Sequence, residues 1–127
     1  DKELIGYDIC PANIILNKFS RELNEEYDID GRLSLSGNFD DNLFNKLNSI
    51  PYYKKDLPKS LDINFIEKNY YPFFLNKDPK DILHTYVNHI GYQVNNAIKK
   101  KKSRILLTGG GAFNKHILKK IIIGYLS

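Results

Sequence analysis

Apolar residues recur every three or four positions along one stretch near the end of the chain, which predicts a long amphipathic helix over Asp78–Lys102. Asp78 is a good N-cap, Pro79 suits the first helical position, and Asp81 adds negative charge in the first turn. The apolar stripe consists of Ile82, Tyr86, Ile90, Val94, Ala97 and Ile98. The lysine run 99–102 fits a solvated helix C-terminus better than an anion-binding patch.

Shorter stretches with the same spacing predict further helices. One runs from Pro11, in its first turn, to about Asn24, and a second covers Asp40–Ile50 and ends at Pro51. Between Tyr52 and Leu75 only Ile63–Asn69 suits a helix. The inward-facing residues are Ile15, Phe19 and Leu23 in the first helix and Leu43, Phe44 and Leu47 in the second. The turn-forming residues between Glu25 and Gly37 predict a loop.

Two apolar runs predict strands near the two ends of the chain. The first is Leu4–Ile9, and the second is Arg104–Thr108, which is apolar on both faces like a covered parallel strand. The second runs into Gly109-Gly110-Gly111, and the spacing after it predicts a final helix over Asn114–Leu126. Strands that lead into helices indicate an α/β domain that is rich in helix.

Composition limits the class of protein. A chain of 127 residues with 42% hydrophobic residues fits one globular domain. The single cysteine, Cys10, excludes an internal disulfide. No apolar run is long enough to span a membrane, and residues 1–3 do not start a signal peptide. We therefore expect a cytoplasmic location. The net charge of +4 includes only three arginines, which is weak support for binding nucleic acid.

Two segments are candidates for chemistry. Three consecutive glycines, Gly109–Gly111, between a strand and a helix allow a ligand close to the backbone, and the helix start favours a phosphate; a purely structural tight turn explains the glycines equally well. Asp8 lies at a strand-to-helix junction, where ligands of open α/β sheets gather, so it is a candidate general base or metal ligand. From its position alone, a helix cap or a structural partner for backbone amides explains it better.

Other candidates fail on spacing. The segment from Asp28 has Phe39 where a calcium loop needs a bidentate Glu. The histidines do not form a zinc set, and we expect each of His84, His89 and His116 to be at the surface or half-buried. Cys10 is expected to be a small buried residue rather than a nucleophile. We therefore predict no metal-ligating residues.

The motifs taken together resemble those of the anhydro-N-acetylmuramic acid kinases. Gly6-Tyr7-Asp8-Ile9-Cys10-Pro11-Ala12-Asn13 resembles the family's Gly-x-Asp-Thr-Gly-Pro-Gly-Asn motif. Four further similarities follow in the family's order: Tyr27-Asp28-x-Asp30-Gly31, Ser36-Gly37, Pro51-Tyr52-Tyr53 with Pro58-Lys59-Ser60, and Thr108-Gly109-Gly110-Gly111-Ala112-Phe113-Asn114.

The resemblance implies an ATP-dependent kinase of the superfamily of actin, heat-shock ATPases and hexokinase. Such an enzyme hydrolyses the 1,6-anhydro bond of anhydro-N-acetylmuramic acid and phosphorylates O6 in peptidoglycan recycling, with ATP and Mg²⁺ as cofactors. Asp8 falls on the catalytic aspartate, and Gly109, Gly110, Gly111 and Asn114 fall on the nucleotide motif. Asn13 and Lys59 are candidates for binding substrate or phosphate, and Lys59 is equally well explained as a surface lysine.

The chain also departs from the family pattern. Ile9, Cys10 and Ala12 replace Thr, Gly and Gly, and Leu61-Asp62 replaces Thr-Gly. The family's phosphate loop and its late helix with a second acid are not found. We therefore expect residues 1–127 to be one domain, a partial C-terminal, nucleotide-side lobe of the actin-like (ribonuclease H-like) fold, and to be inactive in isolation.

Two other functions are weighed against the kinase. The first is a non-catalytic binding module of the same fold without the phosphate loop, and the second, ranked last, is a small basic nucleic-acid binder. The expected partners are ATP and an amino sugar, with no nucleic acid and no membrane. For the full-length protein we consider a homodimer.

Overall fold

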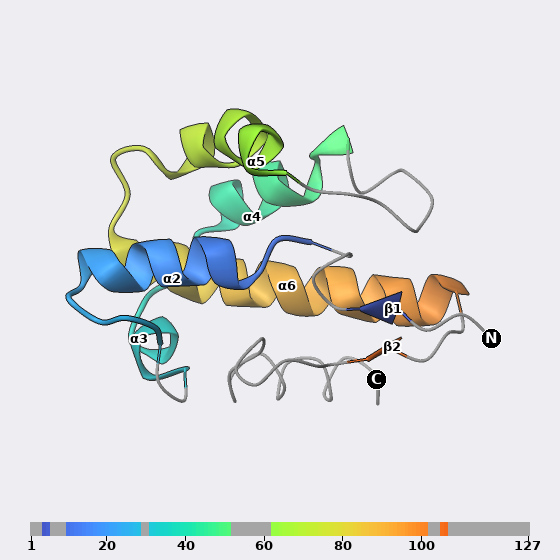
Figure 1. The fold of residues 1–127 in the computed structure, drawn as a ribbon, viewed down its shortest axis with the longest axis horizontal. Helices are drawn as coiled ribbons and strands as arrows, with labels where there is room; N and C mark the ends of the chain where they lie inside the picture. Colours follow the sequence, from blue (N-terminus) through green and yellow to red (C-terminus); the bar gives the residue numbers. More distant parts are fainter. Residues whose placement is uncertain (1–3, 6–9, 29–30, 52–61, 102–104, 107–127) are drawn as a thin grey trace.

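The computed structural model describes residues 4–5, 10–28, 31–51, 62–101 and 105–106, and this part of the chain is mostly helical (Figure 1). The elements follow in the order β1 (Leu4–Ile5), α2 (Asn13–Glu22), α3 (Arg32–Leu35), α4 (Asp41–Asn48), α5 (Ile63–Asn69), the 3₁₀-helix η3 (Tyr71–Phe74), α6 (Pro79–Lys101) and β2 (Ile105–Leu106). No helix in these ranges is long and apolar enough to cross a membrane.

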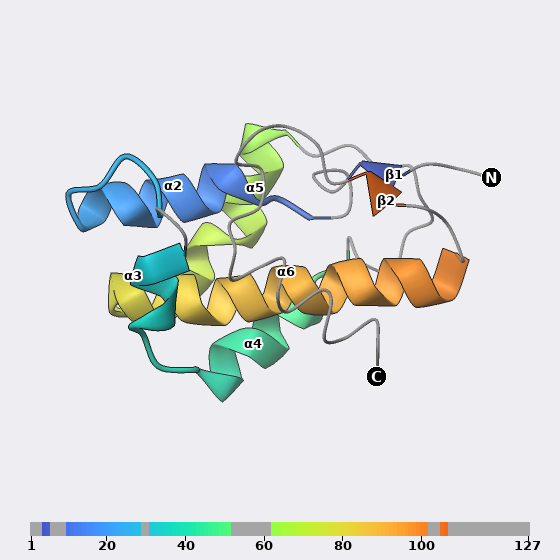
Figure 2. The same cartoon turned by 90° about the horizontal axis from the view of Figure 1, so that it is seen from below.

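The long helix α6 is the centre of the described structure. Asp78 caps its start, because the carboxylate accepts the backbone N–H of Lys80 at 2.8 Å. The predicted stripe from Ile82 to Val94 is buried, and helices α2, α3 and α4 all contact α6. Figure 2 shows α2 and α4 on opposite sides of α6. The amphipathic pattern of α6 therefore organises the packing of the other helices.

Local capping explains two other predicted helices. The carboxylates of Asp40 and Asp62 accept the backbone N–H groups of Leu43 and Phe65 at 3.0 and 2.8 Å, at the starts of α4 and α5. Helix α5 has the predicted bounds. In α4, Leu43 and Leu47 are fully buried as predicted, whereas Phe44 is half-buried.

The first and last described elements pair with each other. β1 and β2 are parallel, with Leu4 opposite Ile105 and Ile5 opposite Leu106. The described part of each strand has two residues, and the rest of the predicted strands Leu4–Ile9 and Arg104–Thr108 lies outside the described residues. The described part of the chain is therefore rich in helix, as predicted, with one short pair of parallel strands. The actin-like lobe stays a prediction. The predicted final helix, Asn114–Leu126, lies outside the described residues.

Two predictions of local structure are wrong. The segment predicted as a loop contains the short helix α3, because both Asp28 carboxylate oxygens accept backbone N–H groups, from Leu33 at 2.6 Å and from Ser34 at 3.0 Å. Pro11 lies before α2 instead of in its first turn, since α2 begins at Asn13. The described core consists of Cys10, Ala12, Ile15, Leu16, Phe19, Leu43, Leu47, Ile50, Ile66, Tyr70, Phe74, Ile82, Leu83, Tyr86, Val87, Ile90 and Val94.

Candidate active site

The junction in front of α2 is the described part of the motif that contains Asp8. Cys10, Pro11 and Ala12 are all buried, and Cys10 has no exposed surface, as predicted for a small core residue. The carbonyl of Ala12 accepts the backbone N–H groups of Ile15 and Leu16 at 3.1 and 3.0 Å, and the N-cap residue Ala12 makes no side-chain cap. The junction therefore belongs to the core, and Asn13 lies half-buried at its edge.

A hydrogen bond ties this junction to the central helix. The hydroxyl of Tyr86, in α6, donates to the carbonyl oxygen of Pro11 at 2.5 Å. Tyr86 is fully buried, and this burial, reinforced by the neighbouring Cys10 thiol, raises the pKa of Tyr86 well above its ordinary value. The phenol therefore stays protonated and can keep donating to the carbonyl.

Aromatic rings hold Tyr86 in place. The Tyr86 ring makes edge-on contacts with Tyr70, at 6.5 Å between ring centroids, and with Phe74 at 6.1 Å. Phe74 in turn meets Phe19 of α2 edge-on at 5.0 Å. Tyr70, directly before η3, and Phe74, in η3, thus contact the ring whose hydroxyl reaches Pro11, and Phe19 of α2 supports Phe74.

A buried polar cluster lies one turn further along α6. His89 is completely buried, which corrects the prediction of a surface or half-buried histidine. Its Nδ1 lies 2.7 Å from the side-chain oxygen of Asn48, which also accepts the amide N–H of Gln93 at 3.0 Å. Burial lowers the pKa of His89 from 6.5 to about 3, so the ring is neutral at physiological pH and donates from Nδ1. The cluster joins the end of α4 to α6.

His84 has the half-buried environment that the sequence predicts. Its Nδ1 lies 2.8 Å from the carbonyl oxygen of Ser34, in α3. In the described part of the chain, no group of three or more His, Cys, Asp or Glu side chains is arranged to hold a metal ion. His84 and His89 therefore connect helices α3 and α4 to α6 through separate hydrogen bonds.

The parallel strands relate the two predicted motifs. The register pairs Ile5 with Leu106, so both strands run in the same direction and end side by side. In the sequence, Asp8 comes three positions after Ile5, and Gly109 comes three positions after Leu106. Both candidate motifs therefore come shortly after a paired strand segment in the sequence, and their own residues lie outside the described residues.

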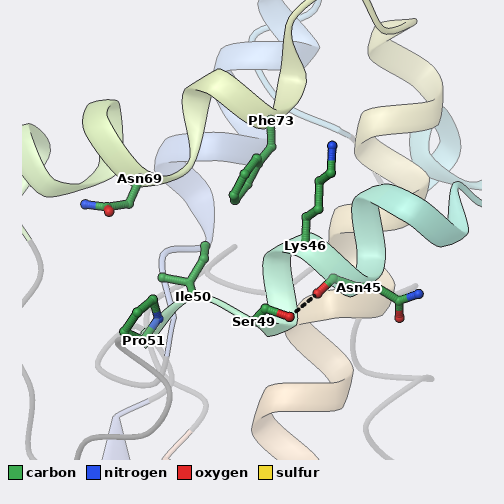
Figure 3. A pocket seen from close by; sticks show the side chains of 7 residues that line it. All are labelled: Asn45, Lys46, Ser49, Ile50, Pro51, Asn69 and Phe73. Atoms are coloured by element: carbon green, nitrogen blue, oxygen red, sulfur yellow. Dashed lines mark hydrogen bonds between the residues drawn. The ribbon is translucent and has the colours of Figure 1, made fainter.

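A surface pocket of about 330 Å³ lies between the end of α4 and the η3 region (Figure 3). The Phe73 ring points from η3 toward Ile50, and Lys46 extends from α4 on the other side. The remaining lining residues are Asn45, Ser49, Pro51 and Asn69. Pro51 is the first residue of the Pro-Tyr-Tyr motif. The pocket therefore adjoins the segment that begins with this motif, and its lining combines the cation of Lys46 with the apolar side chains of Ile50, Pro51 and Phe73.

Two other motif residues have structural roles in the described chain. Asp28 caps α3, so its carboxylate is already engaged by two backbone N–H groups. Gly37 lies against the first turn of α6, where a Cβ would come within 2.0 Å of the carbonyl oxygen of Lys80. The Asp28 and Gly37 motifs thus fix how the segment around α3 packs on α6.

The structure describes few of the predicted site residues. Asn13 is the first residue of α2, whereas Asp8, Lys59, Gly109–Gly111 and Asn114 lie outside the described residues. Sequence reasoning missed Tyr86 as a hydrogen-bond donor, because the apolar spacing indicated only a buried ring. No sequence signal links Tyr86 with Pro11, which is 75 positions away.

The family model and the relatives that match this chain all carry the same description. The family model described as "Anhydro-N-acetylmuramic acid kinase" matches residues 1–125. Proteins named anhydro-N-acetylmuramic acid kinase from Francisella tularensis subsp. novicida and from Pseudomonas syringae pv. syringae are each 30% identical to the chain, over 94% and 95% of its length. One from Aliivibrio fischeri is 29% identical over 95% of the chain. The alignments cover 34%, 35% and 35% of these relatives, so the chain spans about a third of their length.

Proposed function

The chain belongs to the anhydro-N-acetylmuramic acid kinase family, and we propose that it is one part of an ATP-dependent kinase acting on this anhydro sugar. The full-length enzyme would open the 1,6-anhydro bond with water and phosphorylate O6, as a cytoplasmic step of peptidoglycan recycling. The match of the family model to residues 1–125 carries the proposal. The ordered motifs and the parallel register of β1 and β2 support it.

In this proposal Asp8 is the general base. It would take a proton from the water that attacks the anomeric carbon C1, while the C1–O6 bond breaks. The released O6 would then accept the γ-phosphoryl group of ATP, with ADP as the leaving group. The N-terminus of α2, a ten-residue helix, begins five positions later, and its dipole favours a negative charge in this region. Asn13, at the start of that helix, is a candidate contact for substrate, and Lys59 is a candidate contact for phosphate or sugar.

ATP supplies the phosphoryl group in this reaction, and Mg²⁺ neutralises its phosphate charge. We assign the nucleotide contacts to Gly109, Gly110, Gly111 and Asn114, all outside the described residues. In the described part of the chain, β2 precedes the glycine segment in sequence and pairs in parallel with β1, which precedes Asp8. That arrangement fits a nucleotide held near the same sheet edge as Asp8.

We further propose that residues 1–127 form the nucleotide-side lobe of an actin-like kinase. Phosphoryl transfer depends on positioning both substrates between two lobes, so this chain alone should have no kinase activity. The expected partners are ATP and the amino sugar. A homodimer of the full-length protein is a separate expectation, and sedimentation of that protein would test it.

The test is an activity assay on the full-length protein with ATP, Mg²⁺ and anhydro-N-acetylmuramic acid. We expect Asp8→Asn to lower turnover by about 10²–10⁴-fold, the usual contribution of a general base, and to leave ATP binding intact. Asp28→Asn is the matched control, since this carboxylate caps α3.

Each outcome has a distinct meaning. Full activity in the Asp8→Asn enzyme would refute the role of Asp8. No turnover of the sugar by the wild-type protein would refute the substrate. ATP binding without any turnover would favour the alternative function, a non-catalytic module of the same fold.

A further inference from the structure

We propose that the pocket between the end of α4 and η3 binds a small organic anion, namely a single ring that carries one carboxylate. The proposal is independent of the kinase reaction, because none of the residues assigned to that reaction lines the pocket. All of the lining residues belong to the described part of the chain. The volume of about 330 Å³ is at the lower end of the range of ligand pockets in proteins, which suits a ligand with one ring.

Lys46 supplies the positive charge of the pocket. Its exposed side chain extends from α4 along one side of the pocket (Figure 3). Among the described residues, the lysines that form ion pairs are Lys18 and Lys77, so the Lys46 ammonium group has no carboxylate partner there. The lining contains no acidic residue either. A single cation without a counter-charge matches one carboxylate better than a phosphate, which carries up to about two negative charges.

The neutral polar groups of the lining are engaged within the protein. The Ser49 hydroxyl donates to the backbone carbonyl oxygen of Asn45 at 2.8 Å, and the side-chain amide of Asn69 donates to the carbonyl of Phe65 at 2.9 Å (Figure 3). At the end of α4, the carbonyl of Lys46 accepts the backbone N–H of Ser49 at 3.2 Å. The Lys46 ammonium group is therefore the charged group that a ligand in the pocket would meet.

The apolar half of the pocket suits a flat ring. Ile50 is buried, and the half-buried Phe73 ring points toward it from η3, with Pro51 beside Ile50 in the same wall (Figure 3). The elements α4 and η3 contact each other, so the cation and the aromatic ring are held on two packed elements. A ligand ring can pack on Phe73 while its carboxylate faces Lys46. The combination of these two groups specifies a ring with one acidic substituent.

Benzoate is the probe for this pocket, and benzamide is its neutral counterpart of nearly the same size. Ligand-observed NMR titrations of the full-length protein, at constant ionic strength, measure the two dissociation constants. We expect a millimolar Kd for benzoate, because one ring offers few contacting atoms. Benzamide should bind about two- to fivefold more weakly, which is the range that an exposed ion pair provides.

Three variants separate the charge from the ring. Lys46→Gln should abolish the preference for benzoate over benzamide, because both probes then meet a neutral side chain. Lys68→Gln is the matched control and should keep the preference, since Lys68 is likewise an exposed lysine in the last turn of a short helix, α5, but does not line the pocket. Phe73→Leu should weaken both probes by the same factor, because it removes the aromatic ring and keeps the charge.

Three results would overturn the proposal. One is an equal preference for benzoate in the wild type and in Lys46→Gln, and another is an equal loss of that preference in Lys68→Gln. The third is the absence of benzoate binding at about 20 mM. If Phe73→Leu does not fold, the comparison of the two lysine variants decides alone, because both lysines are exposed. None of these results bears on the proposed kinase function, since no turnover is measured.

Discussion

Acid should destabilise this fold through His89. The ring is completely buried between α4 and α6, and burial lowers its pKa from 6.5 to about 3. Above pH 6.5 the ring is neutral in both the folded and the unfolded state, and the free energy of unfolding is at its full value. As the pH falls toward 3, the unfolded state binds the proton more strongly than the folded state, so the free energy of unfolding decreases. The difference between the two pKa values corresponds to about 5 kcal/mol, which is comparable with the whole stability of many small domains.

Urea unfolding of the chain at a series of pH values measures this effect. Between pH 6 and pH 4.5 we expect His89 to contribute a slope of up to about 1.4 kcal/mol per pH unit in the free energy of unfolding. His89→Gln should lower stability at neutral pH and remove this part of the slope. The difference between the two slopes is the relevant quantity, because the other histidines are common to both proteins.

Two results would refute the reasoning about His89. One is an NMR titration in which the folded chain protonates this ring near pH 6.5. The other is an identical pH slope in the wild type and in His89→Gln. Either would mean that the ring is solvated, and that its contact with Asn48 is not the buried hydrogen bond that the structure describes.

Two further predictions concern how other segments pack on α6. Gly37→Ala should lower the free energy of unfolding, measured in urea, by about 1–3 kcal/mol, because the new Cβ would overlap the backbone carbonyl of Lys80 in α6. A decrease of less than about 0.5 kcal/mol would contradict this prediction and would show that the segment can move away from α6. Asp40→Asn should cost about 1 kcal/mol at neutral pH, since it weakens the cap of α4 and the 2.6 Å ion pair with Lys77. The hydrogen bond from Lys77 lowers the pKa of Asp40, so this difference should shrink as the pH falls below about 3.8, and a constant difference would contradict it.

The helices that the sequence predicts correctly have local signals. Asp40, Asp62 and Asp78 each stand directly before an amphipathic stretch and cap it in the structure. Helix α3 lacks such a signal, because its capping residue, Asp28, lies four positions ahead of it, across a glycine with a left-handed φ of 72°. Its formation depends on packing against α6, which spacing alone does not indicate.

In the candidate site too, some residues have a local signal in the sequence and others do not. Asp8 and the glycine segment are recognisable from residue types that follow one another in the order of the family's motifs. Tyr86 is recognisable only as an apolar position, because its hydrogen bond depends on one oxygen atom reaching a carbonyl from a distant part of the chain. The burial of His89 is equally hidden, since the Asn48 partner lies on another helix.

The structure also accounts for three of the departures from the family pattern. Cys10 and Ala12, which replace glycines, are buried in the core cluster, so their side chains add apolar contacts beneath the junction and are not exposed to a ligand in solution. Asp62, which replaces another glycine, caps α5. Each replacement therefore has a local structural role, in core packing or in helix capping. Because these three side chains already have such roles, their differences from the family are no argument against a shared substrate.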